Sequence, residues 1–213
     1  MKKLLLPLFS IIFINFISCK DIDPKVDNEY NLEIPEVIVQ NELPPDSATI
    51  NRAWEKHMTP SKTHEIMAQD NGVWEEEITM WASRKSDPVK STFKVINKMI
   101  LGGRYQESTH KGDMMGMPFE GISTLAYDNT AQEYVSTWID NMGTGIMVMK
   151  GQFNSDTKSI NFEGKTIDPL TRKEKKLKEI FTYIDSNTQK IEMFDIDYDG
   201  KQFKSMEAIL KRK

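Results

Sequence analysis

From Val73 to the end of the chain, short segments that alternate apolar and polar residues are separated by turn-forming residues. Side chains of a β-strand point alternately to two faces, so this repeat of two is typical of strands with one buried face. Pairs such as Asp-Pro, Gly-Gly and Asp-Gly, which favour turns, separate many of the segments. We therefore predict ten strands, at residues 73–82, 92–101, 104–110, 119–127, 133–140, 145–153, 158–163, 177–185, 190–196 and 202–212.

The connections between these strands are too short for parallel neighbours, which need a crossover of about a dozen residues or more. About ten antiparallel strands in chain order are best closed into a barrel, because closure removes the unpaired edges. Before the first strand, Pro60-Ser61 begins a short helical segment at 61–69, with Ile66 and Met67 expected to point inward. The predicted fold is all-β, an antiparallel up-and-down barrel preceded by a short helix.

The alternation also predicts which side chains face the barrel interior. On three strands these are Trp74, Glu76, Ile78 and Met80, then Phe93, Val95, Asn97 and Met99, and finally Met147, Met149 and Phe153. An acid inside a barrel needs a partner or water. The inward position of Glu76 therefore indicates an internal cavity that holds solvent or a ligand.

The amino end has the layout of a secretion signal. Met1-Lys2-Lys3 is basic, residues 4–17 are almost all apolar, and Ser18 precedes Cys19. The apolar run is shorter than the ~20 residues that a spanning helix needs. Residues 16–19 resemble the lipobox of bacterial lipoproteins, and Cys19 is the only cysteine in the chain. The resemblance implies that residues 1–18 are a cleaved signal peptide and that Cys19 is lipidated, which would anchor the protein to a membrane.

The residue after Cys19 bears on which membrane that is. Lys20 stands where lipoproteins retained at the inner membrane often have Asp, which favours the outer membrane. Residues 19–23 also resemble, with one interrupting isoleucine, the export tag of surface lipoproteins of the Bacteroidota. We expect an exported protein on the periplasmic face of the outer membrane or on the cell surface.

Residues 19–48 carry two basic and eight acidic side chains, several prolines and only one aromatic residue. Such a segment cannot bury enough apolar surface to fold, so we predict an acidic, disordered tether. Residues 37–39 are its one patch that would suit a strand.

The chain has a net charge of −4, with +2 in the signal and −6 in the tether, so residues 49–213 are neutral. This segment is predicted to be the barrel domain, and its neutrality argues against nucleic acid as a partner.

Several ordered motifs of residues 58–213 resemble the bacterial family known as domain of unknown function 1579. The resemblance is carried by Gly72-Val73-Trp74, Leu101-Gly102-Gly103-Arg104, the stretch Met114 to Gly121, Tyr127-Asp128-Asn129, the stretch Trp138 to Gly145, Gly151, Met206-Glu207 and Lys211-Arg212-Lys213. Ala126 departs from the pattern, which has a glycine directly before the tyrosine. The family implies a lipocalin-like barrel and no established activity. Gly72-x-Trp74 is also similar to the Gly-x-Trp signature of lipocalins, which implies that a basic residue of the last strand, here Arg212, covers Trp74.

Motifs that would indicate catalysis or metal binding are incomplete. Asp195-x-Asp197-x-Asp199-Gly200 resembles the start of a calcium loop, but position 12 is Met206 instead of the required Glu, so a hairpin turn is favoured. The three histidines lack the spacing of a zinc site. No Gly-x-Ser-x-Gly elbow and no glycine-rich phosphate loop is present. We therefore predict no catalytic residue, metal or cofactor.

Methionine is abundant, with thirteen in the chain. Thioethers are soft ligands for Cu(I), so Met147 and Met149 together with the segment 111–118, expected to be a loop, suggest a copper site. Methionine also fills irregular cores and lines adaptable pockets, which is the favoured interpretation.

We predict a β-barrel cavity that binds a small apolar or amphipathic ligand, lined by Trp74, Glu76, Met99, Tyr127, Trp138, Met147 and Met149. The alternatives are a structural or partner-binding surface module, a Cu(I)-binding protein, and an enzyme using acids such as Glu76 or Asp140.

Overall fold

The computed structural model describes residues 44–213, which contain two helices followed by ten strands. The helices are α1 (Ser47–Met58) and α2 (Lys62–Ala68). The strands are β1 (Gly72–Met80), β2 (Val89–Ile100), β3 (Tyr105–Met114), β4 (Met117–Asp128), β5 (Glu133–Asp140), β6 (Met147–Asn154), β7 (Ser159–Ile167), β8 (Glu174–Asp185), β9 (Thr188–Ile196) and β10 (Gln202–Arg212). The predicted signal peptide, Cys19 and the strand-like patch at 37–39 lie outside the described residues.

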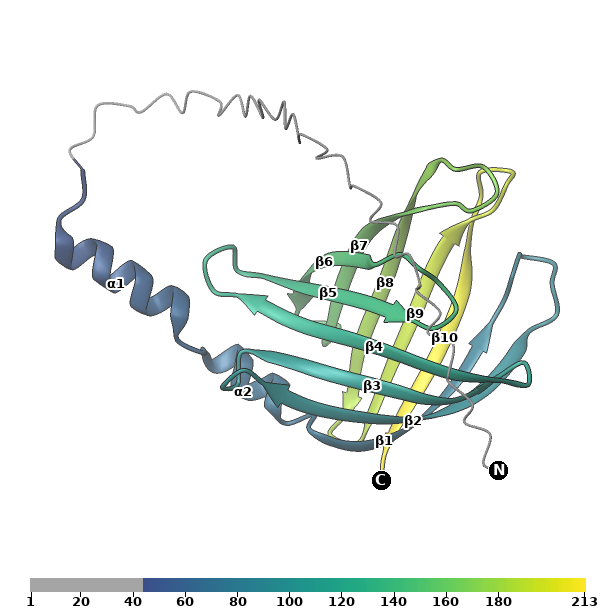
Figure 1. Ribbon diagram of the computed structural model, residues 1–213, viewed down its shortest axis with the longest axis horizontal. Helices are drawn as coiled ribbons and strands as arrows, with labels where there is room; N and C mark the ends of the chain where they lie inside the picture. The colour runs from purple at the N-terminus through teal and green to yellow at the C-terminus, as the bar shows by residue number, and fades with distance from the viewer. Residues whose placement is uncertain (1–43) are drawn as a thin grey trace, which may run out of the picture. The chain divides into compact units, whose positions relative to one another are not determined.

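All ten strands form one closed barrel in which every strand pairs antiparallel with its neighbours in the sequence, and β10 closes the ring against β1. Figure 1 shows this meander, with α2 at the end of the barrel where β1 begins. The closing pair runs from Trp74 opposite Arg212 to Met80 opposite Met206. The predicted all-β, up-and-down, lipocalin-like barrel with a short helix before it is confirmed.

The hairpin between β3 and β4 differs from the prediction. Residues 111–118, expected to be a loop, are strand except for a two-residue turn at Met115-Gly116. Both turn residues have positive φ, 55° and 79°. Two consecutive positive φ values match the twist of antiparallel strands and allow the tightest hairpin. The alternation was obscured here because Gly112 and Gly116 offer no side chain to the pattern.

Helix α1 was not predicted, and it begins at Ser47 within the segment assigned to the tether. Asp46 caps it by accepting a hydrogen bond from the backbone N–H of Thr49 at 2.7 Å. None of its residues is buried. A helix is recognised in a sequence by the apolar stripe of its buried face, and α1 has no buried face. Its carboxyl end contacts the barrel, because Asn129 Nδ2 donates to the backbone carbonyls of Lys56 and Thr59 at 3.1 and 2.8 Å. Among the described residues, no helix is long and apolar enough to cross a membrane.

Helix α2 is the predicted short helix, and it begins at a cap formed by Ser61 and His64. The backbone N–H of Ser61 donates to His64 Nδ1 at 3.0 Å. Met67 is fully buried as predicted, whereas Ile66 is 43% exposed and does not point into the core. Helix α2 has seven residues, which make only two turns. The face that it turns toward the barrel carries Met67, and Ile66 lies at the edge of this face.

Two clusters of buried apolar residues fill much of the barrel. The first cluster comprises Trp74, Ile78, Phe93, Val95, Phe119, Ala208 and Leu210. The second cluster comprises Met67, Tyr134, Met149, Ile160, Phe162 and Leu177. The inward faces predicted for β1 and β2 are confirmed, since Trp74, Glu76, Phe93, Val95 and Asn97 are all buried. On β6 the prediction holds for Met149, but Phe153 is 47% exposed because it lies at the end of the barrel.

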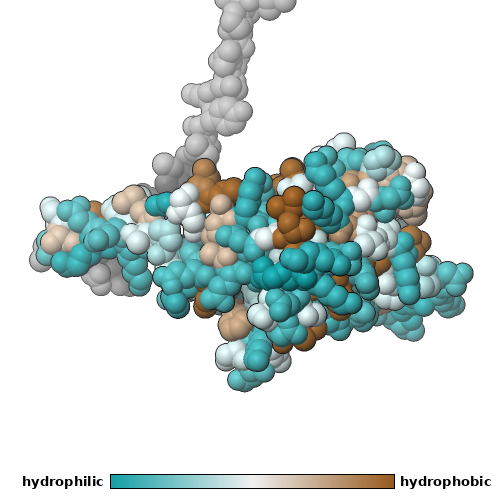
Figure 2. Space-filling model, turned by 90° about the horizontal axis from the view of Figure 1, so that it is seen from below, coloured by the Kyte–Doolittle hydropathy of each residue, from teal (hydrophilic) through white to brown (hydrophobic). Residues whose placement is uncertain are grey.

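The outer surface is largely hydrophilic. Figure 2 shows one face of the molecule, on which teal side chains predominate and hydrophobic side chains are scattered between them. Exposed polar pairs such as Lys111–Glu120 and Lys150–Glu133, each at 2.8 Å, bridge neighbouring strands on the outside. The alternation along the strands therefore separates the interior with its two apolar clusters from a solvated exterior.

Candidate functional site

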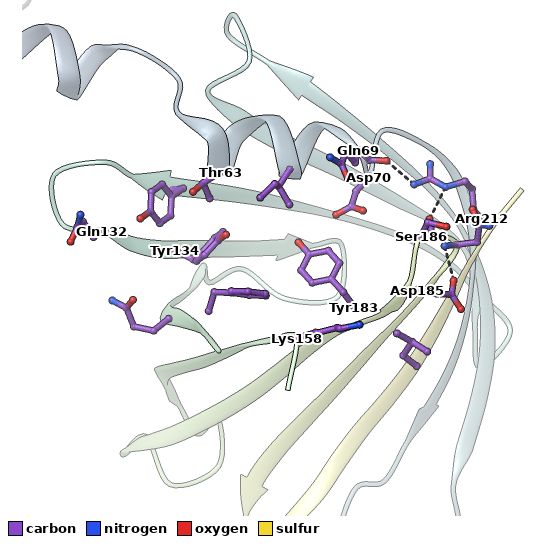
Figure 3. A pocket seen from close by; sticks show the side chains of 16 residues that line it. Thr63, Gln69, Asp70, Gln132, Tyr134, Lys158, Tyr183, Asp185, Ser186 and Arg212 are labelled. Carbon is purple, nitrogen blue, oxygen red and sulfur yellow. Dashed lines mark hydrogen bonds between the residues drawn. The ribbon is translucent and has the colours of Figure 1, made fainter. Parts of the chain in front are cut away.

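A pocket of about 780 Å³ lies at the end of the barrel next to α2. Residues of α2, the β6–β7 turn, the β8–β9 turn and the adjoining strand ends surround it (Figure 3). The lining residues are Thr63, Ile66, Gln69, Asp70, Tyr127, Gln132, Tyr134, Gln152, Phe153, Lys158, Tyr183, Ile184, Asp185, Ser186, Asn187 and Arg212. We call this cavity the mouth pocket.

Aromatic side chains form one wall of the mouth pocket. The rings of Tyr127 and Tyr134, on the paired strands β4 and β5, have centroids 4.9 Å apart. Phe153 and Tyr183, from β6 and β8, meet edge to face at 6.4 Å. Tyr134 is buried and belongs to the second cluster, against which Tyr127 and Tyr183 pack. The wall of the pocket is therefore continuous with the apolar core.

Arg212 holds the opposite side of the mouth pocket together. Its guanidinium lies 4.2 Å from the centroid of the Trp74 ring, which confirms the prediction that Arg212 covers this tryptophan. The same guanidinium donates to the backbone carbonyls of Gln69 and Asn71 at 2.7 and 2.8 Å and of Ser186 at 3.3 Å. One side chain of β10 thus joins the end of α2 to the β8–β9 turn.

Two further side chains fix the end of α2 on the barrel. Trp74 Nε1 donates to the carbonyl of Asp70 at 2.9 Å, and Gln106 Nε2 donates to the carbonyl of Met67 at 2.6 Å. The first bond joins β1 to the residues that follow the helix, and the second joins β3 to its last turn. The helix is therefore a fixed part of the rim of the pocket.

Asp70 is the buried acid of the mouth pocket, and Figure 3 shows it between Tyr183 and Arg212. Burial raises the pKa of Asp70 to about 6, and the opposing effects of Arg212, Tyr183 and Gln189 are smaller. Burial likewise raises the pKa of Tyr134 to about 12 and the pKa of Tyr183 above its ordinary value. Both phenols are therefore neutral hydrogen-bonding groups at neutral pH.

Of the seven residues predicted to line a ligand cavity, Tyr127 lines the mouth pocket. Trp74 and Met149 are 1% exposed and belong to the first and second cluster, respectively. Met99, Trp138 and Met147 are partly buried side chains packed against the clusters. The remaining residue, Glu76, is buried in the interior, where its Oε2 lies 2.8 Å from His110 Nδ1.

The methionines are divided between different surroundings. Met149 is buried in the second cluster, with Met147 packed against that cluster, whereas Met114 packs against the first cluster. Met115 and Met117 are 63% and 48% exposed at the β3–β4 hairpin. The copper site was expected to need residues 111–118 as a loop folded over Met147 and Met149. Residues 111–118 form a regular hairpin between β3 and β4 instead.

The other candidate metal or catalytic residues have structural partners. The backbone N–H of Asp197 donates to the carbonyl of Lys201 at 2.8 Å, which confirms the predicted hairpin turn at Asp199-Gly200. Asp195 pairs with Lys175 at 2.6 Å. Within residues 44–213, no cluster of three or more His, Cys, Asp or Glu side chains is arranged to hold a metal ion. Asp140, proposed for an enzyme, accepts hydrogen bonds from Trp138 Nε1 at 2.7 Å and from the backbone of the following turn.

The sequence did not reveal which polar residues line the mouth pocket. Asp70 directly follows the predicted helical segment, Tyr183 lies within a predicted strand, and Asn187 lies between two predicted strands. The sequence did indicate the end of the barrel at which the pocket lies, because it predicted the contact of Arg212 with Trp74 at that end. The depth of the pocket depends on how α2 sits across that end, and no local pattern encodes this.

Ten strands in chain order, closed by β1 against β10 and partly covered by a helix, define a lipocalin-like up-and-down barrel. The chain belongs to the family described as "Protein of unknown function (DUF1579)", whose model matches residues 59–212. Among solved structures, it resembles the crystal structure of Rv2717c from M. tuberculosis, with a TM-score of 0.55 and 14% identity over 73% of this chain and 99% of that chain. A likeness at this identity concerns the fold alone. The comparison with curated proteins found no match.

Proposed function

We propose that this protein is a membrane-anchored lipoprotein whose barrel binds a small amphipathic ligand in the mouth pocket. The observation that carries the proposal is a cavity of about 780 Å³ with an aromatic wall and a polar rim. Small-molecule sites are typically concave, within about 300–1,000 Å³, with mostly apolar walls and a few polar groups that orient the ligand. The rigid attachment of α2 makes the pocket preformed, which lowers the entropy cost of binding.

The mouth pocket favours ligand binding over two alternatives, a structural or partner-binding module and an enzyme. A purely structural or partner-binding module needs no cavity, whereas this barrel has one beside its core. An enzyme needs titratable groups that converge within reach of a substrate. The pair formed by Glu76 and His110 converges, but neither side chain lines the mouth pocket.

Binding can be tested with the environment-sensitive amphipathic dye 1-aminoanthracene. Residues 45–213 form one compact unit with a closed barrel, so this segment is suitable for the assay. We expect saturable fluorescence enhancement that Tyr183→Ala and Phe153→Ala each weaken by about tenfold, which is about 1.4 kcal/mol. Tyr198→Ala is the matched control, because this tyrosine is 77% exposed in the β9–β10 loop, away from the mouth pocket. Enhancement that all three variants leave unchanged would contradict binding in this pocket.

The anchor is tested separately on the full chain. Metabolic labelling with palmitate is expected to mark the protein and to follow it into the membrane fraction. Cys19→Ala removes the only thiol of the chain, so label and membrane association should both be lost. Retained membrane association without label would argue against a lipid anchor, whatever the barrel binds.

A further inference from the structure

The inner wall of β1–β4 carries a band of polar side chains between apolar ones. Asn97, Ser108 and Ser123 lie directly opposite one another on β2, β3 and β4. His110 is the next inward residue of β3, and its Nδ1 lies 2.8 Å from Oε2 of Glu76 on β1. Asn97, Ser108, His110 and Glu76 are all buried, so the band lies in the interior of the barrel.

The unused hydrogen-bonding capacity of this band includes buried acceptors. The side-chain oxygen of Asn97 has no partner among the described residues, although the residue is only 6% exposed. If His110 donates Nδ1–H to Glu76, its Nε2 is also an acceptor. A buried group left without a partner costs about 1–3 kcal/mol, which a ligand with donor groups would recover.

Glu179 adds a carboxylate from another wall of the barrel. It faces inward on β8, opposite the buried Phe162 of β7 and beside Met193 of β9. Its pKa is raised to about 7 by burial and by the negative charge of Glu76, and no hydrogen bond offsets these effects. The two inward cations of the described chain are already engaged: Lys175 by Asp195, and Arg212 by backbone carbonyls. Glu179 therefore faces the interior without a cationic partner among the described residues.

Aromatic rings lie next to the band. The Trp138 ring meets the His110 ring edge to face at 5.0 Å, Phe119 stacks on Trp138 at 6.3 Å, and Phe93 stacks on Phe119 at 4.8 Å. Aromatic faces attract cations through the negative potential above the ring. Aromatic rings in an interior that also holds buried carboxyl groups are surroundings that suit an organic ammonium ion.

The interior has room for such a group. A barrel of about eight strands is just filled by its side chains, and this one has ten. Inward-facing Trp138, Glu179 and Met193 are only partly buried, although the barrel around them is closed. Their remaining accessible surface therefore faces the inside of the barrel.

We propose that the barrel interior holds a second site, for an organic cation with a primary ammonium group and a small apolar body, between Glu179 and the wall formed by Asn97, His110 and Glu76. The ammonium donates to the free acceptors and neutralises the facing carboxylates, and the apolar body contacts the aromatic rings. None of these residues lines the mouth pocket, so the inference does not depend on what the mouth pocket binds.

The test compares 2-phenylethylammonium with 2-phenylethanol, which has nearly the same size and shape but no charge, by isothermal titration calorimetry on residues 45–213 at pH 8. The ammonium probe is expected to bind at least about tenfold more tightly than the alcohol. Glu179→Gln keeps the size of the side chain and removes its charge, so it should abolish this preference while the alcohol binds as before. Glu163→Gln, an exposed acid on neighbouring β7, is the matched control and should keep the preference.

Three results would overturn the proposal. Equal affinity for the two probes, or no binding of either, would show that the interior does not select an ammonium group. A preference that survives Glu179→Gln but is lost in Asp70→Asn would place the cation at the acid of the mouth pocket instead. The thermal unfolding transition of each variant verifies that the barrel is intact, and removal of an unpaired buried charge should not lower it.

Discussion

The two apolar clusters of the barrel differ in what surrounds them. The first cluster, around Trp74, is covered by Arg212, which stacks on the ring and bonds to backbone carbonyls on both sides of it. The second cluster, around Tyr134 and Met149, has partly exposed Tyr127 and Tyr183 packed against it, and these face the mouth pocket. Both clusters stabilise the barrel, but only the second continues into the aromatic wall of the mouth pocket.

This difference bears on binding in the mouth pocket. The first cluster does not line this pocket, so its side chains affect binding there only through the stability of the barrel. The second cluster supports rings that are not fully covered, and such surface gains free energy when a ligand covers it. Substitutions in the two clusters should therefore have distinct effects on unfolding and on ligand affinity.

Trp74→Ala should have the largest effect on stability. The indole is 1% exposed, donates to the carbonyl of Asp70 and supports the Arg212 guanidinium, so its loss leaves a cavity and removes two contacts. We expect a decrease of about 3–5 kcal/mol in the free energy of unfolding, measured by urea denaturation. A decrease below about 1 kcal/mol would mean that the first cluster is loosely packed.

Met149→Ala tests the second cluster. The side chain is 1% exposed and packs with Tyr134 and Phe162. Its truncation should lower the free energy of unfolding by about 2–4 kcal/mol and also weaken binding of 1-aminoanthracene, because the aromatic wall loses its support. Met149→Leu, which nearly conserves volume, is the control and should change both quantities little. Unchanged dye affinity in Met149→Ala would show that the wall does not depend on this cluster.

Glu179→Gln should affect the pH dependence of stability. The folded-state pKa of about 7 exceeds the ordinary value of 4.5, so the folded protein binds more protons between these values and its stability decreases as pH rises through them. At pH 8 the variant should be more stable than the wild type by about 3 kcal/mol, and near pH 4 the two should be similar. Thermal denaturation at both pH values measures this. Parallel pH profiles would refute the raised pKa.

Trp54→Ala provides the smallest expected effect and a matched control for Trp74→Ala. Trp54 lies on α1, is 58% exposed and contacts His57 of the same helix at 5.6 Å between ring centroids. Its loss should change the free energy of unfolding by less than about 0.5 kcal/mol, because nothing buried depends on it. A larger decrease in urea denaturation would show that α1 packs on the barrel more closely than its exposure indicates.

The fold was predictable because its determinants are local. Strands β5 and β10 have the predicted bounds, and the inward faces of β1 and β2 follow the alternation. Short turns then allow only antiparallel neighbours in chain order. The elements that were missed lack such a pattern, as in α1 with its fully exposed surface and in the turn at Met115 with its positive φ.

The candidate sites were only partly predictable. Periodicity placed Glu76 and Asn97 inside the barrel, yet it did not pair Glu76 with His110. It likewise proposed Trp74 and Met149 as cavity lining, whereas the structure buries both in the core. Period two gives the face of a strand but not the depth of a side chain within the barrel.

The sequence by itself determined the strand order, the inward faces and the contact of Arg212 with Trp74, since these follow from periodicity, turn length and a recognisable pair of residues. Only the tertiary structure decided where space remains. It placed α2 against one end to form the mouth pocket, brought Glu76 of β1 to His110 of β3, and turned Glu179 of β8 into the same barrel interior. Cavities and charge clusters arise where distant strands meet, and the closure and tilt of the barrel set those distances, which no local pattern of residues encodes.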